Sequence, residues 1–507
     1  MLQRAGLEET RAKLGRSFLE RGSRLEDRLQ RRIVSTVIPQ IAQGFLDDGQ
    51  GRPGIVGQPT DEELAETFRA SLIFLYRLLF LLYAESRAFL PIGDASSLAV
   101  TLKQTREEIA ACGGVSASAL ANRLQQAYAE TDTTLFDRLS LLFRTMELFP
   151  SEARATNHAC DSPARFLAEH KVSDRRLAIA LDALSRDQAD GTTRLEFVDY
   201  KLLDVRQLGS IHESLLGYKL CGTRINAASR REKPAQFNRR DHQSEPSLSA
   251  LSCEVSLVSQ TKGRKASGSY YTPPAIVEYL VANTVGPVLD EKLHALRSDL
   301  RAERNQAQRG KGEQPPDLFD RLYDLRIIDP AMGCGHFLVE AVNFIASRLL
   351  DFLTEFPGSP AHSAQGQTIS GNALGDRSLI KRCVLERCIY GVDVDPMAVE
   401  LTKATLALEC GLPGVPFIFP QSHLHCGNAL VGEVGRVKTV PLSADAKPPV
   451  FNWHLEFPDV FAEASACDGF DCVVGNPPYV RIQNLDNALV RYLEQHFETA
   501  AGKFDLY

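Results

Sequence analysis

A glycine-rich turn between a short apolar run and a long amphipathic segment most constrains the fold of this chain. The turn, Asp-Pro-Ala-Met-Gly-Cys-Gly-His-Phe, occupies residues 329–337 directly after the apolar run from Leu325 to Ile328. We interpret this stretch as a strand, a tight turn and the start of a helix. In a parallel sheet such a turn lies at the carboxyl end of a strand, where ligands bind, and its glycines let the backbone approach a ligand closely. The sequence therefore predicts a ligand site here.

Strand and helix signals alternate after Gly268. The expected helices span residues 276–285, 337–352 and 396–408, and the expected strands span residues 325–328, 388–392, 424–426 and 470–474. This alternation predicts an α/β fold in which a parallel sheet is covered by helices on both faces, with right-handed crossovers.

The first 221 residues have a different pattern. Apolar residues recur there at three- and four-residue spacing and strand-like alternation is scarce, which predicts a mainly α-helical domain. Thr60 to Glu63 is expected to cap one of its helices. The most apolar segment, Ala70 to Ala84, is too short to span a bilayer and has Arg77 at its centre, so we expect a buried core helix and no membrane association.

Two basic stretches allow two interpretations each. From Gly222 to Ser267 the composition shifts to Arg, Ser, Asn, Gln and Pro, and Arg297 to Lys311 is a second basic insertion. We interpret the first as a linker, residues 222–267, which is either a solvated loop or a set of phosphate contacts.

The step Glu169-His170-Lys171, with Asp161 upstream, has the residue types of a metal-dependent nuclease, but a surface helix end is the simpler expectation.

Overall charge and cysteine content exclude few classes of function. A formal net charge of -7 means that any nucleic-acid binding would depend on local basic patches. The 11 cysteines are scattered, with no Cys-x-x-Cys pair. We therefore expect a reduced, cytoplasmic protein without a zinc site.

An acidic residue follows the second predicted strand of the sheet. In Gly391 to Pro396 the strand leads directly to Asp393, whose carboxylate is placed to accept both hydroxyls of a ribose, while Asp395 and Pro396 are typical of a helix cap and first turn. The glycine turn has no basic residue, and Asp329 would repel a pyrophosphate. A nucleoside with a cationic centre fits better, and S-adenosylmethionine is the expected cofactor.

A second candidate constellation is Asn476-Pro477-Pro478-Tyr479, which follows the last predicted strand. Two prolines impose a rigid, non-helical loop at the same sheet edge. The Asn476 side-chain oxygen and the Pro477 carbonyl are positioned to accept the two hydrogens of a planar amine, and Tyr479 offers a ring on which a base can stack. This pattern predicts chemistry on an amino group.

These motifs resemble those of the γ-class N6-adenine DNA methyltransferases. The resemblance rests on residues 329–337 and 476–479 together with Gly268-Ser-Tyr-Tyr-Thr-Pro-Pro274 upstream. More narrowly, the chain is similar to the large methylases of type IIG restriction systems and their relatives in BREX and DISARM phage defence. Residues 75–80 and 207–213 extend the likeness more loosely into the helical half.

The resemblance implies roles for individual residues. Tyr271, Thr272 and Pro273 would close over the methionine end of S-adenosylmethionine. Four residues of the glycine turn would surround the amino-acid part of the cofactor, namely Asp329, Ala331, Gly333 and Gly335.

The resemblance also assigns the nucleoside end of the cofactor and the target base. Asp393 would hold the ribose, Val394 would pack on the adenine, and Asn428 would bind the adenine amine through its oxygen, with its amide orientation left open. Asn476, Pro477, Pro478 and Tyr479 would hold a flipped target adenine.

The expected architecture is an incomplete Rossmann-like methyltransferase sheet preceded by the helical domain. Residues 268–507 would form the catalytic domain, with its last strands and target recognition domain missing, because Lys503 to Tyr507 resembles the start of the next motif. Double-stranded DNA and other subunits of a defence system are the implied partners. Protein glutamine or RNA methyltransferases, which also act on planar amines, and a non-catalytic DNA-binding scaffold are the alternatives.

Overall fold

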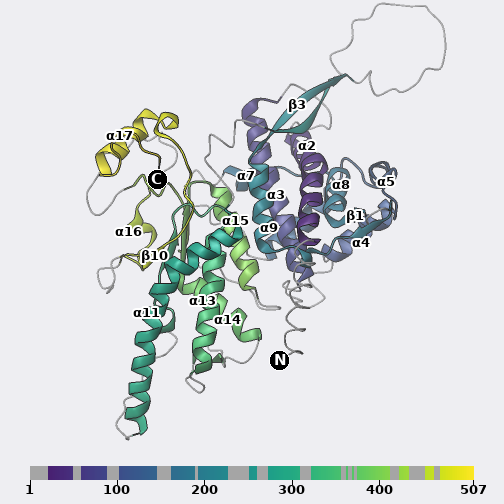
Figure 1. Cartoon of the computed structure of the whole chain (residues 1–507). Coiled ribbons are helices and arrows are strands. Elements are labelled where there is room, and N and C mark those ends of the chain that lie inside the picture. The colour runs from purple at the N-terminus through teal and green to yellow at the C-terminus, as the bar shows by residue number, and fades with distance from the viewer. Residues whose placement is uncertain are drawn as a thin grey trace, which may run out of the picture. The chain divides into compact units, whose positions relative to one another are not determined.

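The chain divides into two compact units, each of which is described separately. The computed structural model describes residues 21–49, 59–87, 102–145, 162–188, 192–226, 251–259, 272–308, 321–355, 361–362, 368–369, 374–411, 422–432, 451–461 and 469–506. The helical unit comprises Met1–Gln207 and Ser214–Gly263, and the sheet unit comprises Leu208–Glu213 and Arg264–Tyr507. Figure 1 shows their elements. A short piece of the amino-terminal half therefore belongs to the sheet unit, which the sequence did not indicate.

The helical unit is mainly α-helical, as predicted. Residues 21–32 are helical and lead into η1 (Ile33–Val37). The other helices are α2 (Ile38–Gly49), α3 (Asp61–Ser86), α4 (Leu102–Gly113), α5 (Leu120–Ala127), α6 (Thr134–Thr145), α7 (Ser162–Glu169), α8 (Asp174–Ser185) and η4 (Tyr200–Leu202). Helix α9 (Val205–Leu215) contributes its middle to the sheet unit, and β1 (Arg186–Gln188) pairs antiparallel with β2 (Leu195–Phe197).

Helix α3 forms the centre of this core. The predicted capping box is present, because the Glu63 backbone N–H donates to the Thr60 hydroxyl at 3.2 Å and the Thr60 N–H donates to the Glu63 carboxylate at 2.7 Å. By length and composition α3 could cross a membrane, but 78% of its most apolar window is buried inside the structure. The expectation of a core helix is confirmed.

The linker prediction is wrong for the parts of residues 222–267 that the structure describes. Strand β3 (Tyr218–Asn226) pairs antiparallel with β4 (Leu251–Ser259), and Leu220 and Val255 are buried in one cluster with Ala42 and Leu64. The missed signal is the alternation of apolar residues with Ser and Glu along 251–257. Residues 227–250 and 260–267 lie outside the described part.

The structure also describes residues 297–308 and the end of α7, two further stretches that the sequence singled out. Residues 297–308, predicted as a basic insertion, continue helix α11 (Pro274–Gln308). Helix α7 ends at Glu169, whose exposed carboxylate pairs with Arg165 at 2.8 Å, while the Lys171 ammonium pairs with Asp137 at 2.9 Å. The surface helix end is confirmed, and Asp161 lies outside the described residues.

The sheet unit contains a parallel sheet of order β10-β5-β8-β9. The strands are β5 (Ile327–Asp329), β8 (Ile389–Asp393), β9 (Leu424–Cys426) and β10 (Cys472–Val473). All four predicted strands are confirmed, with β10 shorter than expected. The smaller elements are β6 (Ala361–His362) paired with β7 (Thr368–Ile369), η7 (Ile482–Asn484) and α17 (Asn487–His496).

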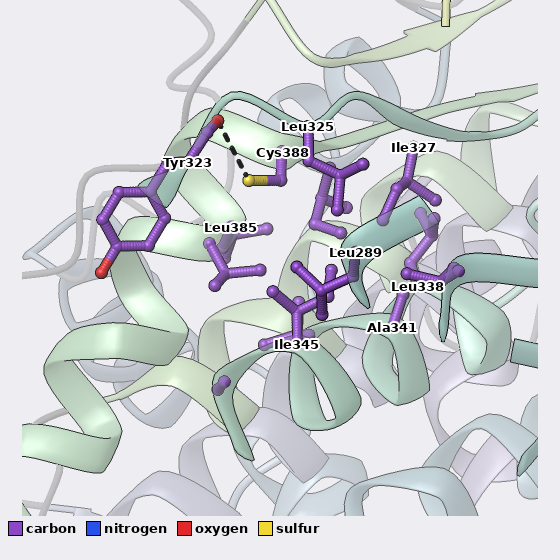
Figure 2. Packing of buried hydrophobic residues seen from close by; sticks show 14 of the residues in the cluster. Leu289, Tyr323, Leu325, Ile327, Leu338, Ala341, Ile345, Leu385 and Cys388 are labelled. Atoms are coloured by element: carbon purple, nitrogen blue, oxygen red, sulfur yellow. Dashed lines mark hydrogen bonds between the residues drawn. The ribbon is translucent and has the colours of Figure 1, made fainter. Parts of the chain in front are cut away.

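Helices cover one face of the sheet. Helix α11, α13 (His336–Glu355), α14 (Leu374–Cys388) and α15 (Pro396–Cys410) share a core with Ile327, Ile389 and Leu424. Figure 2 shows side chains of α11, α13 and α14 meeting in this core, where the Cys388 thiol donates to the Tyr323 carbonyl at 3.5 Å. Cys388, predicted to begin a strand, instead ends α14.

The other face differs from the prediction of helices on both sides. Among the described residues it is covered by the segment 451–461, which contains only the short helix α16 (Trp453–Glu456). Phe451, Phe457 and Val460 pack there against Ile328 and Tyr390. Aromatic side chains thus fill the volume that a longer helix would occupy.

We predict that Phe457→Ala destabilises the protein by about 3–5 kcal/mol, the usual cost of emptying a buried phenylalanine site. Phe457 is fully buried and meets Tyr390, Trp453 and Phe470 edge-on or tilted. Denaturant unfolding of the full chain measures the change. Leu455→Ala is the matched control, since Leu455 is 76% exposed and should shift stability by less than about 0.5 kcal/mol. Equal effects would contradict this packing.

Candidate functional site

The sheet order brings the loops after β5 and β10 to the same place. Successive strands β5, β8 and β9 proceed to one side, and β10 then returns to pair on the other side of β5. Ligands bind at such a reversal of strand order, outside the carboxyl ends of the strands. The two loops approach so closely that a Cβ on Gly475 would lie 2.6 Å from an Asp329 carboxylate oxygen. Glycine is therefore required at position 475.

The glycine turn after β5 is held by helix α15. Gly333 and Gly335 have positive φ angles of 54° and 83°. The Thr402 hydroxyl donates to the Gly333 carbonyl at 2.8 Å, and a Cβ on Gly335 would meet the Thr402 side chain at 2.8 Å. Among the described residues, in contrast, no atom would lie within 4 Å of a Cβ on Gly333. The turn is thus fixed on the side of α15.

Asp393 lies beside the glycine turn, as predicted. Its Oδ2 accepts the Gly333 N–H at 2.8 Å and its Oδ1 accepts the Asp395 N–H at 2.9 Å. Burial raises the pKa of Asp393 to about 6 despite these hydrogen bonds. Asp395 caps α15 by accepting the Met397 N–H at 3.0 Å, which confirms that interpretation. Asp393 therefore ties the end of β8 to the turn, and its predicted ribose contact would use its remaining lone pairs.

Asp329 is the most buried carboxylate of the site, with 1% of its surface exposed. Its Oδ1 accepts the Ala331 N–H at 3.0 Å. Burial, reinforced by repulsion from Asp393, raises the pKa of Asp329 to about 8. This carboxyl therefore holds its proton to a higher pH than an ordinary aspartate does. A cationic ligand would favour its ionised form.

Thr272 orients the side chain of Asn476. The Asn476 Nδ2 donates to the Thr272 hydroxyl oxygen at 3.0 Å, which directs the amide oxygen elsewhere. Pro477 and Pro478 follow in an irregular, half-buried loop, and Tyr479 is 62% exposed. This hydrogen bond leaves the amide oxygen of Asn476 to accept from another donor, and the Tyr479 ring is accessible.

The motif before α11 is partly described. Pro273 accepts the first backbone hydrogen bonds of α11, from the N–H groups of Ile276 and Val277. Tyr271 lies outside the described residues. Thr272 and Pro273 therefore lie at the start of a helix whose body packs against β10.

The third strand contributes Asn428. Its Oδ1 accepts the Leu430 N–H at 3.0 Å, and the neighbouring Gly427 N–H donates to the Asp393 carbonyl at 2.9 Å. The oxygen expected to bind the adenine amine of the cofactor thus accepts a backbone N–H in the ligand-free chain, and the role of Asn428 stays a prediction. Val394, an apolar residue with more than half of its surface exposed, follows Asp393 directly.

The described candidates all lie at the carboxyl ends of the four strands or at the start of α11. They are Thr272, Pro273, Asp329, Ala331, Gly333, Gly335, Asp393, Val394, Asn428, Asn476, Pro477, Pro478 and Tyr479. Their individual roles stay predictions. Sequence reasoning missed Thr402 and Gly475; the position of Gly475, directly before the Asn-Pro-Pro-Tyr loop, was the signal for the second of them.

Comparison with known proteins finds a matching family model, two similar curated proteins and a similar solved structure. Residues 387–507 match the model of the Eco57I restriction-modification methylase family. A putative type II restriction enzyme and methyltransferase of Methanocaldococcus jannaschii, RM.MjaORFECS2P, is 29% identical over 197 residues, covering 34% of this chain and 15% of that protein. The type II restriction enzyme and methyltransferase RM.Eco57I of Escherichia coli is 24% identical over 196 residues, covering 36% of this chain and 17% of that protein.

A solved structure, that of the type IIL restriction-modification enzyme MmeI in complex with DNA, is also similar. The match has a TM-score of 0.39 and 14% sequence identity, and it covers 86% of this chain and 47% of that chain. The chain thus spans less than half the length of each of these relatives.

Proposed function

We propose that this chain, whose residues 387–507 form a domain of the Eco57I restriction-modification methylase family, methylates N6 of an adenine in double-stranded DNA with S-adenosylmethionine. The observation that carries the proposal is the orientation of Asn476 by Thr272, at the sheet edge that also holds the buried Asp329 and the half-buried Asp393. The arrangement pairs an acceptor for an amine with a site suited to a cation.

The residues present fit this cofactor. When bound, S-adenosylmethionine supplies an electrophilic methyl group. Asp329 would stabilise its cationic amino-acid end, because a buried carboxylate is best ionised beside a cation. Asp393 would bind the ribose hydroxyls, and the exposed Val394 side chain would pack against the adenine ring. No described residue would come within 4 Å of a Cβ on Gly333, which supports the placement of a ligand against the turn there.

The Asn476 loop would act by positioning rather than by base catalysis. The target base must leave the duplex to expose its amino group, and the exposed Tyr479 ring provides a stacking surface for it. Asn476 Oδ1 and the Pro477 carbonyl would accept the two amine hydrogens, which increases electron density on the nitrogen. An amide is too weak a base to remove a proton, so the amine would lose it to solvent afterwards.

We predict that Asn476→Ala lowers the rate of methyl transfer by about 100-fold or more, the usual effect of removing a positioned polar group from a reacting centre. Transfer of labelled methyl groups to duplex DNA, RNA and protein measures this and identifies the substrate class. Asn484→Ala, a substitution at an exposed position on η7, is the control and should leave the rate unchanged. Labelled RNA or protein with unlabelled DNA would overturn the substrate assignment. No transfer by the unaltered chain to any of the three would favour a binding scaffold.

The role of Thr272 predicts a difference between two substitutions. Thr272→Val removes the hydroxyl that holds Asn476 and should lower kcat about tenfold, which corresponds to about 1.4 kcal/mol. Thr272→Ser keeps the hydroxyl and should retain most of the activity. Steady-state kinetics of both variants test the role. Full activity in Thr272→Val with loss in Thr272→Ser would show that the side-chain methyl, not the hydrogen bond, matters.

The raised pKa of Asp329, about 8, predicts that cofactor affinity depends on pH. Below that value the ligand-free carboxyl holds a proton that a cationic ligand must displace, so affinity should rise with pH by up to about tenfold per unit and level off above it. Because the folded state raises the pKa of Asp329, the free energy of unfolding of the ligand-free protein should fall as pH rises toward about 8.

Calorimetric titration of S-adenosylmethionine between about pH 6 and pH 9, in wild type and Asp329→Asn, tests this prediction. The ligand's amino group and Asp393 titrate in both proteins, so the difference between them isolates Asp329. Identical pH profiles would contradict the assignment.

A further inference from the structure

A carboxylate, a thiol and an imidazole cluster next to the glycine turn, apart from the groups assigned above. Glu213 comes from the α9 piece of the sheet unit, Cys334 from the turn, and His336 from the first position of α13. Cys334 and His336 are buried. The Cys334 thiol donates to Glu213 Oε1 at 3.2 Å and lies 3.8 Å from His336 Nε2. One ligand atom from each residue lies within 4.8 Å of the other two.

We propose that Glu213, Cys334 and His336 bind a divalent metal ion of the zinc class. Sulfur, imidazole nitrogen and carboxylate oxygen are the ligands that zinc takes in proteins. A thiolate and a carboxylate together balance the charge of a divalent ion, and a neutral imidazole adds a third ligand without further charge. Such a set removes the cost of an isolated charge in a buried place.

Distances between the ligand atoms suit such an ion. With metal–sulfur bonds of about 2.3 Å and metal–nitrogen or metal–oxygen bonds of about 2.0–2.1 Å, tetrahedral ligand atoms lie about 3.3–3.6 Å apart. The separations of 3.2 Å and 3.8 Å to the sulfur are near these values, so small side-chain shifts suffice. The other Glu213 oxygen, Oε2, is buried and has no hydrogen-bond partner within the described part of the chain.

The backbone of α9 is shaped to approach the cluster. A Cβ on Gly209 would lie 2.8 Å from both the Cys334 sulfur and His336 Nε2. A bound ion would join this helix to the turn whose Gly333 N–H holds Asp393. Binding displaces the thiol proton to solvent and forms the sulfur–metal bond, with no change in oxidation state. Three protein ligands leave one position of a tetrahedral ion for water.

Metal analysis of the full chain, purified without a histidine tag and then dialysed against zinc or cobalt, tests the proposal. We expect a single ion per chain and, with cobalt, a thiolate-to-metal charge-transfer band. Cys334→Ser and Glu213→Gln should each weaken binding by about tenfold or more. Cys112→Ser, which removes an exposed cysteine of the helical unit, is the control and should bind unchanged. Absence of bound metal in the wild type, or full binding by Cys334→Ser, would overturn the proposal.

A second variant separates loss of ligands from loss of folding. Gly209→Ala keeps all three ligands but places a methyl group against two of them, so it should also weaken binding about tenfold or more. Circular dichroism establishes whether each variant is folded. Should the variants unfold, the cobalt spectrum of the wild type decides alone, and a spectrum without the thiolate band would refute the site.

Discussion

The parallel pairing of β10 with β5 is the constraint on which the site depends. The pairing places β10 directly beside β5. The Asn476 loop and the glycine turn therefore lie at one sheet edge, although more than a hundred residues separate them in the sequence. The pairing is reinforced outside the strands, where the Asp471 carboxylate accepts the Arg326 N–H at 2.7 Å and pairs with the Lys292 ammonium at 3.1 Å. Without this pairing, Asp329 and Asp393 would not lie near the Asn476 amide.

Two carboxylates lie at this edge, the buried Asp329 and the half-buried Asp393, and the surrounding backbone only partly compensates for their loss of hydration. N–H groups reach both Asp329 and Asp393, yet burial still raises the pKa of each. A ligand-free site of this kind is electrostatically unfavourable for the folded state. Binding sites for charged ligands commonly lower the free energy of unfolding of the ligand-free protein in this way, and ligand binding raises it again.

The sequence predicted local structure well and long-range contacts poorly. The capping box at Thr60, the cap at Asp395 and the four parallel strands follow from local spacing, since caps and short apolar runs act over a few residues. The β3–β4 hairpin was missed because the basic residues between its strands obscured their alternation. The residues of the Asn476–Thr272 contact are 204 positions apart, and those of the Cys334–Glu213 contact are 121 apart. No local sequence pattern predicts contacts at such separations.

The residues of helix α9 are divided between the two units. Its residues 208–213 belong to the sheet unit, whereas the chain on both sides of them belongs to the helical unit. The boundary between the units is therefore crossed more than once, and no single cut separates two intact folding modules. Deletion of everything before Arg264 would remove part of the sheet unit itself, including the side chain that accepts the Cys334 thiol hydrogen.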